Sequence, residues 1–443
     1  MLKRKIESLL LDWQRDPARK PLVIKGVRQC GKTFSVQHFA REHYARTVYI
    51  DFFERPEAKA AFQGSKIVDD IVMYLSALIP DAIFVPGETC IILDELQECP
   101  EARTALKFFQ TDGRYDVICT GSLLGVCGYG SKETKAKGMS VPVGYETIVE
   151  MNPLDFEEFL WANHIPSAVI DKLRDCLETE SPVPEAIHRR MNELFLQYAV
   201  VGGMPDAVET FVQTHDIGQV VRIQRNIVDE YEDDMVKYAD DGDKTRIREC
   251  FASIPRQLAK ENKKFQYATI RKGARSAEYL GCLQWIEDAG IIARCHNLRR
   301  TELPLDGNAD EDVFKVYMRD SGLFLSMLEQ GTQADVLMGD LLGYKGAIFE
   351  NVMADIFSKM GRKLYYFHKD SGLEVDFLMR YKGRCTLVEV KSTTGNIKST
   401  KTILKNKDVY HVSSAIKLGR YNVGRSGETL TLPLYMAFLL TCY

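Results

Sequence analysis

A glycine-rich loop near the start of the chain has the residue types that bind phosphate. Residues 26–33 read GVRQCGKT, a G-x-x-x-x-G-K-T pattern between an apolar run and a helical pattern. Gly26 and Gly31 let the backbone fold tightly around an anion, which the amide groups at the helix start then face. Lys32 supplies a charge for the β- and γ-phosphates, and the Thr33 hydroxyl supplies a ligand for Mg²⁺. The loop therefore predicts binding of ATP together with Mg²⁺.

Two acids end the apolar run TCIILDEL, which has the composition of a buried central strand. Asp94 can hold Mg²⁺ through water, and Glu95 can orient or deprotonate the water that attacks the γ-phosphate. An acid pair at the end of a strand can also simply begin a helix. The phosphate loop upstream favours the catalytic interpretation.

Four other residues are candidates for contact with the nucleotide. Arg28 lies inside the loop, where it can contact a phosphate or remain in solvent, and Phe34 directly follows Thr33. Thr120 and Ser122 lie in ICTGSLL, which ends the next apolar strand, and can either sense the γ-phosphate or form an ordinary polar turn. No arginine can be assigned as a finger that completes the site from another subunit.

A second set of candidates lies on a β-hairpin predicted near the end of the chain, GLEVDFLMRYKGRCTLVEVKS. If Lys382 and Gly383 form the turn, Asp376 faces Glu389, and Lys391 follows on the same face. Opposed carboxylates repel each other unless a divalent cation binds between them. A lysine beside such a cation can stabilise an attacking hydroxide or a developing phosphate charge. The spacing is the D…E-x-K arrangement of restriction-like nucleases.

The same alternation of charged and apolar residues is also typical of an ordinary hairpin without a metal site. It places Glu374 opposite Lys391 on the charged face and Val375, Phe377 and Met379 on an apolar face. A charged hairpin face of this kind can simply be solvated. A slip of one residue in the register would also separate the two acids.

Three kinds of segment must position these residues. Five strands that alternate with helical patterns indicate a parallel sheet, at residues 21–27, 46–53, 89–96, 115–121 and 145–151. A mostly helical pattern then runs to about residue 239, with a break at VGGMPDAV that we attribute to packing. Residues 244–325 follow as helices and two short strands, which is a winged-helix order. The third of these helices, 277–292, exposes acids, which favours a packing role over reading DNA.

Composition is typical of a globular protein, with 45% hydrophobic and 27% charged residues in 443. No apolar run approaches the ~20 residues of a membrane span, and the eleven cysteines include no C-x-x-C pair. We therefore expect a cytoplasmic protein with reduced thiols and no membrane partner. From residue 341 onward there are 16 Lys and Arg against 8 Asp and Glu. This basic end on an acidic chain points to nucleic acid as a partner, although it can also be merely a basic domain.

Several segments together resemble one known family. GVRQCGKT, ILDELQECP, TGSLLG, NPLDFEEFLWA and VGGMPDAV are similar to prokaryotic AAA-type ATP-binding proteins related to the archaeal ATPases. The resemblance covers essentially the whole chain. It implies an AAA-like core, a winged-helix segment and a terminal domain of unknown function with a restriction-endonuclease-like fold. Family loops usually carry proline and valine where this chain has Val27 and Cys30, and we expect the Cys30 thiol to lie beside the phosphate site.

The expected fold is an α/β P-loop core followed by a helical and winged-helix region and an α+β domain. We place the core at 1–165, the helical region at 166–243, the winged-helix-like region at 244–335 and the nuclease-like domain at 336–443. Glu350, on the amphipathic pattern GAIFENVMADIFSKMG, matches the acid that restriction-like folds often add to their metal site. Glu350, Asp376 and Glu389 are therefore predicted metal ligands, with Thr33 and Asp94 serving the ATP site.

The sequence thus predicts an ATPase with Lys32 and Glu95 as catalytic residues, and it leaves the role of the terminal domain open. In one interpretation ATP turnover gates a metal-dependent nuclease at Asp376, Glu389 and Lys391. In the other, ATP binding switches a conformation that binds DNA or a partner, and the nuclease-like domain is inactive. AAA resemblance also suggests a homo-oligomer or a protein partner without requiring a ring.

Overall fold

The computed structural model describes the whole chain except residues 123–143, 239–242, 261–262, 340–344, 392–396 and 442–443. Its N-terminal part is a five-stranded parallel sheet in the order β2-β3-β4-β1-β5. All five predicted strands are confirmed. Their bounds are β1 (Leu22–Gly26), β2 (Arg46–Asp51), β3 (Thr89–Asp94), β4 (Asp116–Ser122) and β5 (Thr147–Glu150).

Helices cover both faces of this sheet, because successive strand residues point to opposite sides. Leu22 and Ile24 pack in the core that contains α1 and α2, whereas Val23 packs in a separate core on the other face. The first face carries α1 (Lys5–Arg15) and α2 (Lys32–His43). The second carries η1 (Pro56–Phe62), α3 (Val68–Leu78), η2 (Leu96–Glu98) and α4 (Pro100–Asp112).

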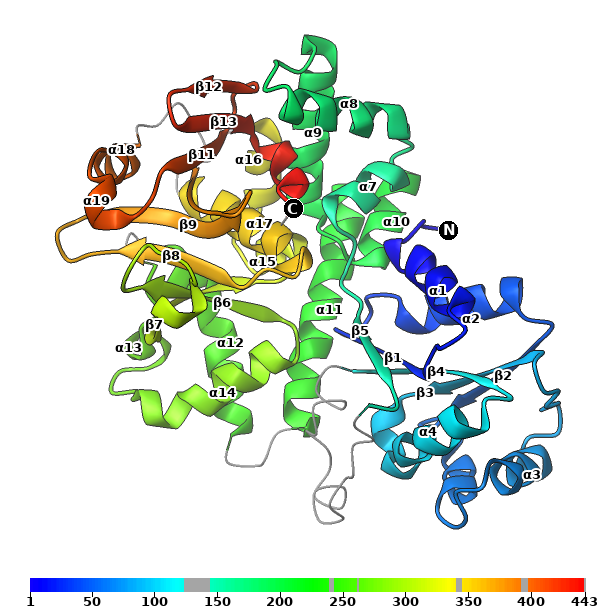
Figure 1. Cartoon of the computed structure of the whole chain (residues 1–443). Helices are drawn as coiled ribbons and strands as arrows, with labels where there is room; N and C mark the ends of the chain where they lie inside the picture. The colour runs from blue at the N-terminus through cyan, green and yellow to red at the C-terminus, as the bar shows by residue number, and fades with distance from the viewer. Residues whose placement is uncertain (123–143, 239–242, 261–262, 340–344, 392–396, 442–443) are drawn as a thin grey trace.

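A helical region joins this sheet to the rest of the chain, and Figure 1 shows its longest helix, α11, standing between the N-terminal and C-terminal sheets. The helices are α7 (Phe156–Ala162), α8 (Ser167–Glu178), α9 (Glu185–Val201), α10 (Pro205–Thr214) and α11 (Ile217–Tyr238). The predicted break at VGGMPDAV separates α9 from α10. A Cβ on Gly203 would lie 2.0 Å from the Leu154 carbonyl oxygen, and one on Gly202 would lie 2.2 Å from Asp320 Oδ1. Close packing requires these glycines, as expected.

The next region has the predicted order of three helices and two strands. It comprises α12 (Lys244–Leu258), α13 (Tyr267–Ile270), α14 (Ser276–Asp288), β6 (Ile292–Leu298), η3 (Asp306–Asn308) and β7 (Ala309–Met318), then α15 (Ser321–Ser326) and α16 (Thr332–Met338). The two strands do not form a free wing. β6 pairs in parallel with β8 (Leu364–His368), so β6 and β7 together form one edge of the C-terminal sheet. One sheet therefore spans the predicted boundary between residues 335 and 336.

The C-terminal part is an eight-stranded mixed sheet in the order β12-β13-β11-β10-β9-β8-β6-β7. Its remaining elements are α17 (Lys345–Lys359), β8 (Leu364–His368), β9 (Glu374–Tyr381), β10 (Arg384–Val390), α18 (Lys398–Lys405), α19 (Lys407–Tyr410), β11 (Ser414–Gly419), β12 (Gly424–Ser426), β13 (Thr429–Pro433) and η4 (Leu434–Leu439). Helix α17 packs in the main core on one face, and Ile403 of α18 packs in a smaller core on the other. No helix within the described ranges is long and apolar enough to cross a membrane.

The predicted hairpin register of β9 and β10 is correct where the two strands pair. Phe377 faces Val388, and Lys382 and Gly383 form the turn with positive φ of 46° and 76°. The predicted alternation fails at one place. Two residue steps along β8 correspond to three along β9, so β9 carries a bulge next to Asp376. Val375 therefore packs in the smaller core, opposite Phe377 in the main core, and not beside it as expected.

Candidate functional site

The glycine-rich loop connects β1 to the start of α2. Gly31 adopts a left-handed φ of 95°, which favours glycine, and a Cβ on Gly26 would lie 2.3 Å from the Met151 carbonyl oxygen. Lys32 begins α2, and its ammonium donates to the carbonyl oxygens of Gly26 (3.1 Å) and Val27 (3.0 Å). The loop thus curls around the lysine, with the first amides of α2 beside it.

Asp94 gathers polar groups from the two strands beside β3 and from α2. The hydroxyls of Thr33 and Tyr49 each donate to Asp94 Oδ2 at 2.8 Å, and the Thr120 hydroxyl donates to Oδ1. The hydroxyl and carboxylate oxygens of Thr33 and Asp94 are hard ligands of the type that Mg²⁺ prefers, so this pair fits the metal that an ATP site requires. Sequence reasoning missed Tyr49, although its place in β2, the strand that pairs with β3, would have suggested it.

Glu95 adopts a left-handed φ of 51° immediately after β3. The Gln97 side chain donates to its carboxylate. Burial raises the pKa of Glu95, and the charge of Asp94 raises it further, while Gln97, Lys32 and Arg28 act in the opposite direction. A carboxylate with a raised pKa next to the loop is suited to accept a proton from water.

The candidates at the end of β4 take different positions. Thr120 is fully buried and bonded to Asp94, as described above. Ser122 is half-buried and pairs with Gly26 in the register of β4 with β1. Both residues therefore lie at the carboxyl edge of the sheet, where the loop begins.

Helix α11 holds the other side of the loop. Arg28 donates to Asp234 Oδ1 at 2.6 Å, and the Tyr231 hydroxyl donates to the Arg28 carbonyl oxygen at 3.0 Å. The Gln29 side chain donates to Glu230. These contacts could not be predicted from the sequence, because they join residues about 200 positions apart. Arg28 lies in an ion pair and not free in solvent.

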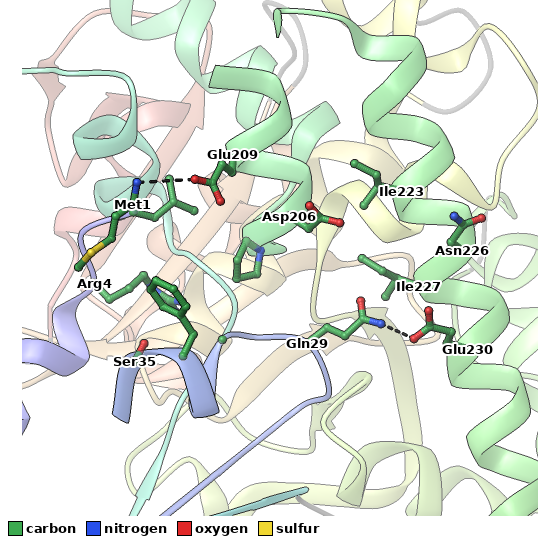
Figure 2. A pocket seen from close by; sticks show the side chains of 14 residues that line it. Met1, Arg4, Gln29, Ser35, Asp206, Glu209, Ile223, Asn226, Ile227 and Glu230 are labelled. Atoms are coloured by element: carbon green, nitrogen blue, oxygen red, sulfur yellow. Dashed lines mark hydrogen bonds and ion pairs between the residues drawn. The ribbon is translucent and has the colours of Figure 1, made fainter. Parts of the chain in front are cut away.

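A cavity of about 620 Å³ opens beside the loop, between the N-terminal segment, α2, α10 and α11 (Figure 2). Gly31 and Phe34 line it on the loop side, and Asp206, Asn226 and Ile227 line it on the helical side. Phe34 is 60% exposed. The volume and the mixture of apolar walls with a few polar groups are suited to a nucleotide base.

Cys30 does not lie beside the phosphate position, contrary to expectation. Its side chain is fully buried, and its thiol donates to the Met151 carbonyl oxygen at 3.3 Å. The Arg4 guanidinium donates to the backbone carbonyl oxygen of Cys30. The thiol therefore packs against Met151, the residue that follows β5, and is closed off from solvent.

The D…E-x-K residues come together in the C-terminal sheet. Lys391 Nζ lies 2.7 Å from Glu389 Oε2 and 3.7 Å from Asp376 Oδ2. The Asp376 carboxylate also accepts the Val390 amide at 2.8 Å, and Glu389 accepts the Thr400 hydroxyl of α18 at 2.6 Å. Burial raises the pKa of Asp376 to about 7, with additions from the charges of Glu350 and Glu389 and opposition from the nearby lysines.

Lysines occupy the space around the third acid. Glu350 is buried on α17 and accepts the Lys263 ammonium and, at 3.1 Å, the Tyr317 hydroxyl. The buried Lys315 ammonium lies 3.8 Å from Glu350 and 2.9 Å from Glu374. In the part of the chain that the structure describes, no three acids, histidines or cysteines group as a metal site requires. Lysines neutralise these acids in the described residues, and the predicted metal set stays a prediction.

Comparison with known protein families matches three segments of the chain. Residues 18–160 match the AAA domain, residues 192–334 match a domain of unknown function (DUF8612), and residues 345–435 match another domain of unknown function (DUF4143). No curated protein matches the chain.

Several solved structures are similar to the chain. A Walker-type ATPase of Pyrococcus abyssi is 14% identical, with 74% of this chain and 96% of that chain covered and a TM-score of 0.43. The Aeropyrum pernix ORC1 protein, solved in complex with DNA, is 13% identical, with 76% and 91% covered and a TM-score of 0.29. A variant of Thermotoga maritima RuvB is 13% identical, with 66% and 87% covered and a TM-score of 0.28.

The match to the AAA domain and the geometry of the glycine-rich loop together identify the fold of the N-terminal part. The segment that matches the AAA domain contains the parallel sheet, the glycine-rich loop and the Asp94 network. It is an AAA-type P-loop core, and this fold implies nucleotide binding. A restriction-endonuclease-like identity of the C-terminal domain remains a prediction.

Proposed function

We propose that this protein binds and hydrolyses Mg-ATP and couples its nucleotide state to the C-terminal module, by which we mean the eight-stranded sheet and the helices packed on it. One observation carries the proposal. The loop lysine and the Thr33 hydroxyl at the start of α2, and the Asp94–Glu95 pair at the end of β3, come from two separate segments and meet at one edge of the sheet. Their residue types are those required to hold a triphosphate and to activate water.

Each residue has a defined role in this proposal. Lys32 and the first amides of α2 bind the β- and γ-phosphates, and the base enters the cavity beside Phe34. Thr33 and Asp94 would hold Mg²⁺, which neutralises charge on the phosphate oxygens when it is bound. Glu95 accepts a proton from the attacking water as the water oxygen bonds to the γ-phosphorus; the bond from that phosphorus to the β–γ bridging oxygen breaks, and ADP leaves with phosphate as the other product.

Direct contacts provide a route from the core to the C-terminal module. Arg319, at the end of β7, donates to Glu150 and Asn152 at the end of β5. Lys359, in the last turn of α17, donates to the Leu154 carbonyl oxygen at 3.1 Å. A rearrangement of the loop and α11 on nucleotide binding would therefore reach the C-terminal sheet through packed elements.

A second function, nucleic-acid cleavage by the C-terminal module, is supported by the contacts of Lys391 with both Asp376 and Glu389. The alternative is a switch whose nuclease-like module binds without cutting. Digestion of plasmid DNA and of RNA with Mg²⁺ or Mn²⁺, with and without ATP, separates the two. Cleavage lost in Asp376→Asn and Lys391→Ala, but retained in the exposed Asp370→Asn, supports the nuclease. Intact ATP hydrolysis without any cleavage supports the switch.

The ATPase proposal is tested by titration of a fluorescent ATP analogue and by phosphate release. Lys32→Ala is expected to weaken binding by about 10–100-fold, because a charged hydrogen bond contributes roughly 1.5–3 kcal/mol. Lys172→Ala removes an exposed lysine of α8 and serves as the matched control. Unchanged affinity in Lys32→Ala would refute the assignment of the loop.

A further inference from the structure

A small hollow lies on the C-terminal module. It has a volume of about 220 Å³, and its walls are residues 299–302, Phe367, Lys369 and residues 409–411. The Thr301 hydroxyl donates to the Tyr410 carbonyl oxygen, which ties the loop after β6 to the end of α19. The hollow is therefore a defined feature of the fold, built where three segments distant in sequence meet.

Positive charge dominates the walls of this hollow. Arg299 and Arg300 have side chains that are 69% and 76% exposed, Lys369 is also exposed, and Arg299 lies 3.4 Å from the Asp310 carboxylate in an exposed ion pair. Glu302 is the one carboxylate among the lining residues, and it lies 3.4 Å from Arg300 and 4.0 Å from His411. Exposed ion pairs of this kind contribute little, so an anion can replace them at low cost.

Aromatic rings stand beside the cations. The rings of Phe367 and Tyr410 lie edge to face with centroids 6.0 Å apart. The Lys369 ammonium lies 4.9 Å from the centre of the Tyr410 ring and 5.7 Å from that of Phe367. Within the described residues, Lys369 pairs with these rings and with no carboxylate. Its charge is therefore uncompensated and available to an anionic ligand.

Helix α18 extends the positive surface from this hollow toward the acid pair. Lys398, Lys401 and Lys405 follow the i, i+3, i+7 spacing of one helix face, are all exposed, and form no ion pair in the described ranges. On the inner side of the same helix, Thr400 donates to Glu389, and Ser399 accepts the amide of Glu374 at 3.2 Å. The lysine face is thus separated from the acids by about one helix diameter, roughly 10 Å.

We propose that this hollow binds the phosphate backbone of single-stranded nucleic acid, whose continuation follows the lysine face of α18 toward Asp376 and Glu389. The proposal rests on the function proposed above for the C-terminal module. Grooves for single strands combine cations that follow the backbone with aromatic rings on which bases stack. The half-buried Tyr410 ring lines the hollow, and a single strand, unlike a duplex, has unpaired bases free to stack on such a ring. An acidic peptide would use the cations but would have no use for the ring.

Fluorescence anisotropy of a labelled oligo-dT 20-mer at low salt tests the site. The triple variant Arg299→Ala/Arg300→Ala/Lys369→Ala is expected to lose at least about 10-fold in affinity, and its slope of log K against log salt falls by about 2. Tyr410→Leu keeps the carbonyl oxygen bound by Thr301 and is expected to weaken binding several-fold through lost stacking.

The control removes three exposed cations elsewhere, in Lys172→Ala/Arg384→Ala/Lys382→Ala. Lys382 and Arg384 lie at the opposite end of β9 from the hollow, roughly 25 Å away for eight residues of strand. Full affinity in this control supports the site, and an equal loss in both triple variants overturns it. Absence of wild-type binding, preference for a duplex, or equal competition by polyglutamate also overturns the proposal.

ATP binding by the same variants keeps this proposal separate from the function on which it rests. The fluorescent ATP analogue is expected to bind every hollow variant as it binds the wild type. Oligonucleotide binding that survives in Lys32→Ala, while ATP binding is lost, supports the hollow independently. Intact ATP binding in a wild-type protein that binds no oligonucleotide overturns the hollow and leaves the ATPase proposal standing.

Discussion

The Arg28 guanidinium of the phosphate loop donates to the Asp234 carboxylate of α11, with Nη1 and Oδ1 2.6 Å apart. The Tyr231 hydroxyl adds a bond from the same helix to the Arg28 carbonyl oxygen. The Arg28 side chain is 39% exposed, so the ion pair contributes little to stability. We expect a bound phosphate to compete with Asp234 for the same arginine, which would make α11 responsive to nucleotide.

The Arg28–Asp234 contact predicts that Asp234→Asn strengthens ATP binding by about 2–5-fold. The substitution removes a negative charge near the phosphates and frees the arginine, an effect of roughly 0.4–1 kcal/mol. Titration with a fluorescent ATP analogue measures the change, and the exposed Asp229→Asn of the same helix is the control. Weaker binding in Asp234→Asn would show that the ion pair supports the binding conformation and does not compete with it.

Glu95→Gln is expected to bind ATP normally and to lower the turnover rate by about 10²–10⁴-fold. The amide keeps the shape of the side chain and its contact with Gln97 but cannot accept a proton from water. Phosphate release at saturating ATP provides the rate, and analogue titration provides the affinity. Glu98→Gln, also an acid of the segment that follows β3, is expected to leave both unchanged. A turnover rate in Glu95→Gln within 3-fold of the wild type would remove Glu95 from the mechanism.

Asp355 is expected to make stability depend on pH. Burial on α17 raises the pKa of Asp355 to about 7, and the charge of Asp320 raises it further. The ammonium of Lys359, 3.0 Å away, opposes this shift, and so does Arg319. Tyr198 also packs against this cluster through its bond with Lys359. Between about pH 4 and 7 the folded protein therefore holds more protons than the unfolded chain, so stability falls as pH rises through this window.

Replacement of this carboxyl tests the sign. In Asp355→Asn the free energy of unfolding is expected to decline less between pH 5 and 8 than in the wild type. The difference in favour of the variant should be roughly 1–4 kcal/mol larger at pH 8 than at pH 5. Thermal melting at both pH values measures the difference, and the exposed Asp370→Asn is the control. If the wild type gains stability relative to Asp355→Asn from pH 5 to 8, the raised pKa of Asp355 is contradicted.

Gly203→Ala is expected to lower the free energy of unfolding by several kcal/mol or to prevent folding. The added Cβ would meet the backbone of Leu154 at 2.0 Å, and a carbonyl group cannot move aside as a flexible side chain can. Gly281→Ala, on α14, meets nothing within 4 Å and is expected to stabilise the helix by about 0.5–1 kcal/mol. Similar melting temperatures for the two variants would contradict the packing interpretation.

Much of the fold could be predicted because its signals are local. Apolar runs that end in Gly26 or Asp94 have the length and composition of buried strands, and all five strands form. The turn at Lys382 and Gly383 fixed the hairpin register because cross-strand pairing follows from turn length. The bulge beside Asp376 was not predicted, because it shows only in the pairing of β9 with β8 and no residue in β9 signals it.

The candidate sites divide in the same way. The sequence by itself determined the glycine-rich loop, the Asp94–Glu95 pair and the D…E-x-K spacing, since each is a short pattern whose chemistry depends on residue type and separation. Only the tertiary structure decided what surrounds them. It buried Cys30 against Met151, placed Tyr49 on Asp94 and brought α11 onto the loop.

The same holds for the charges around Glu350. Lys263 and Lys315, which come from different segments, neutralise an acid that the sequence assigned to a metal. The pKa of a buried carboxyl and its counter-ion depend on which segments pack together, and packing joins residues that are far apart in the chain. Residue types thus defined the chemistry available to this protein, and the packing of distant segments decided which charges meet.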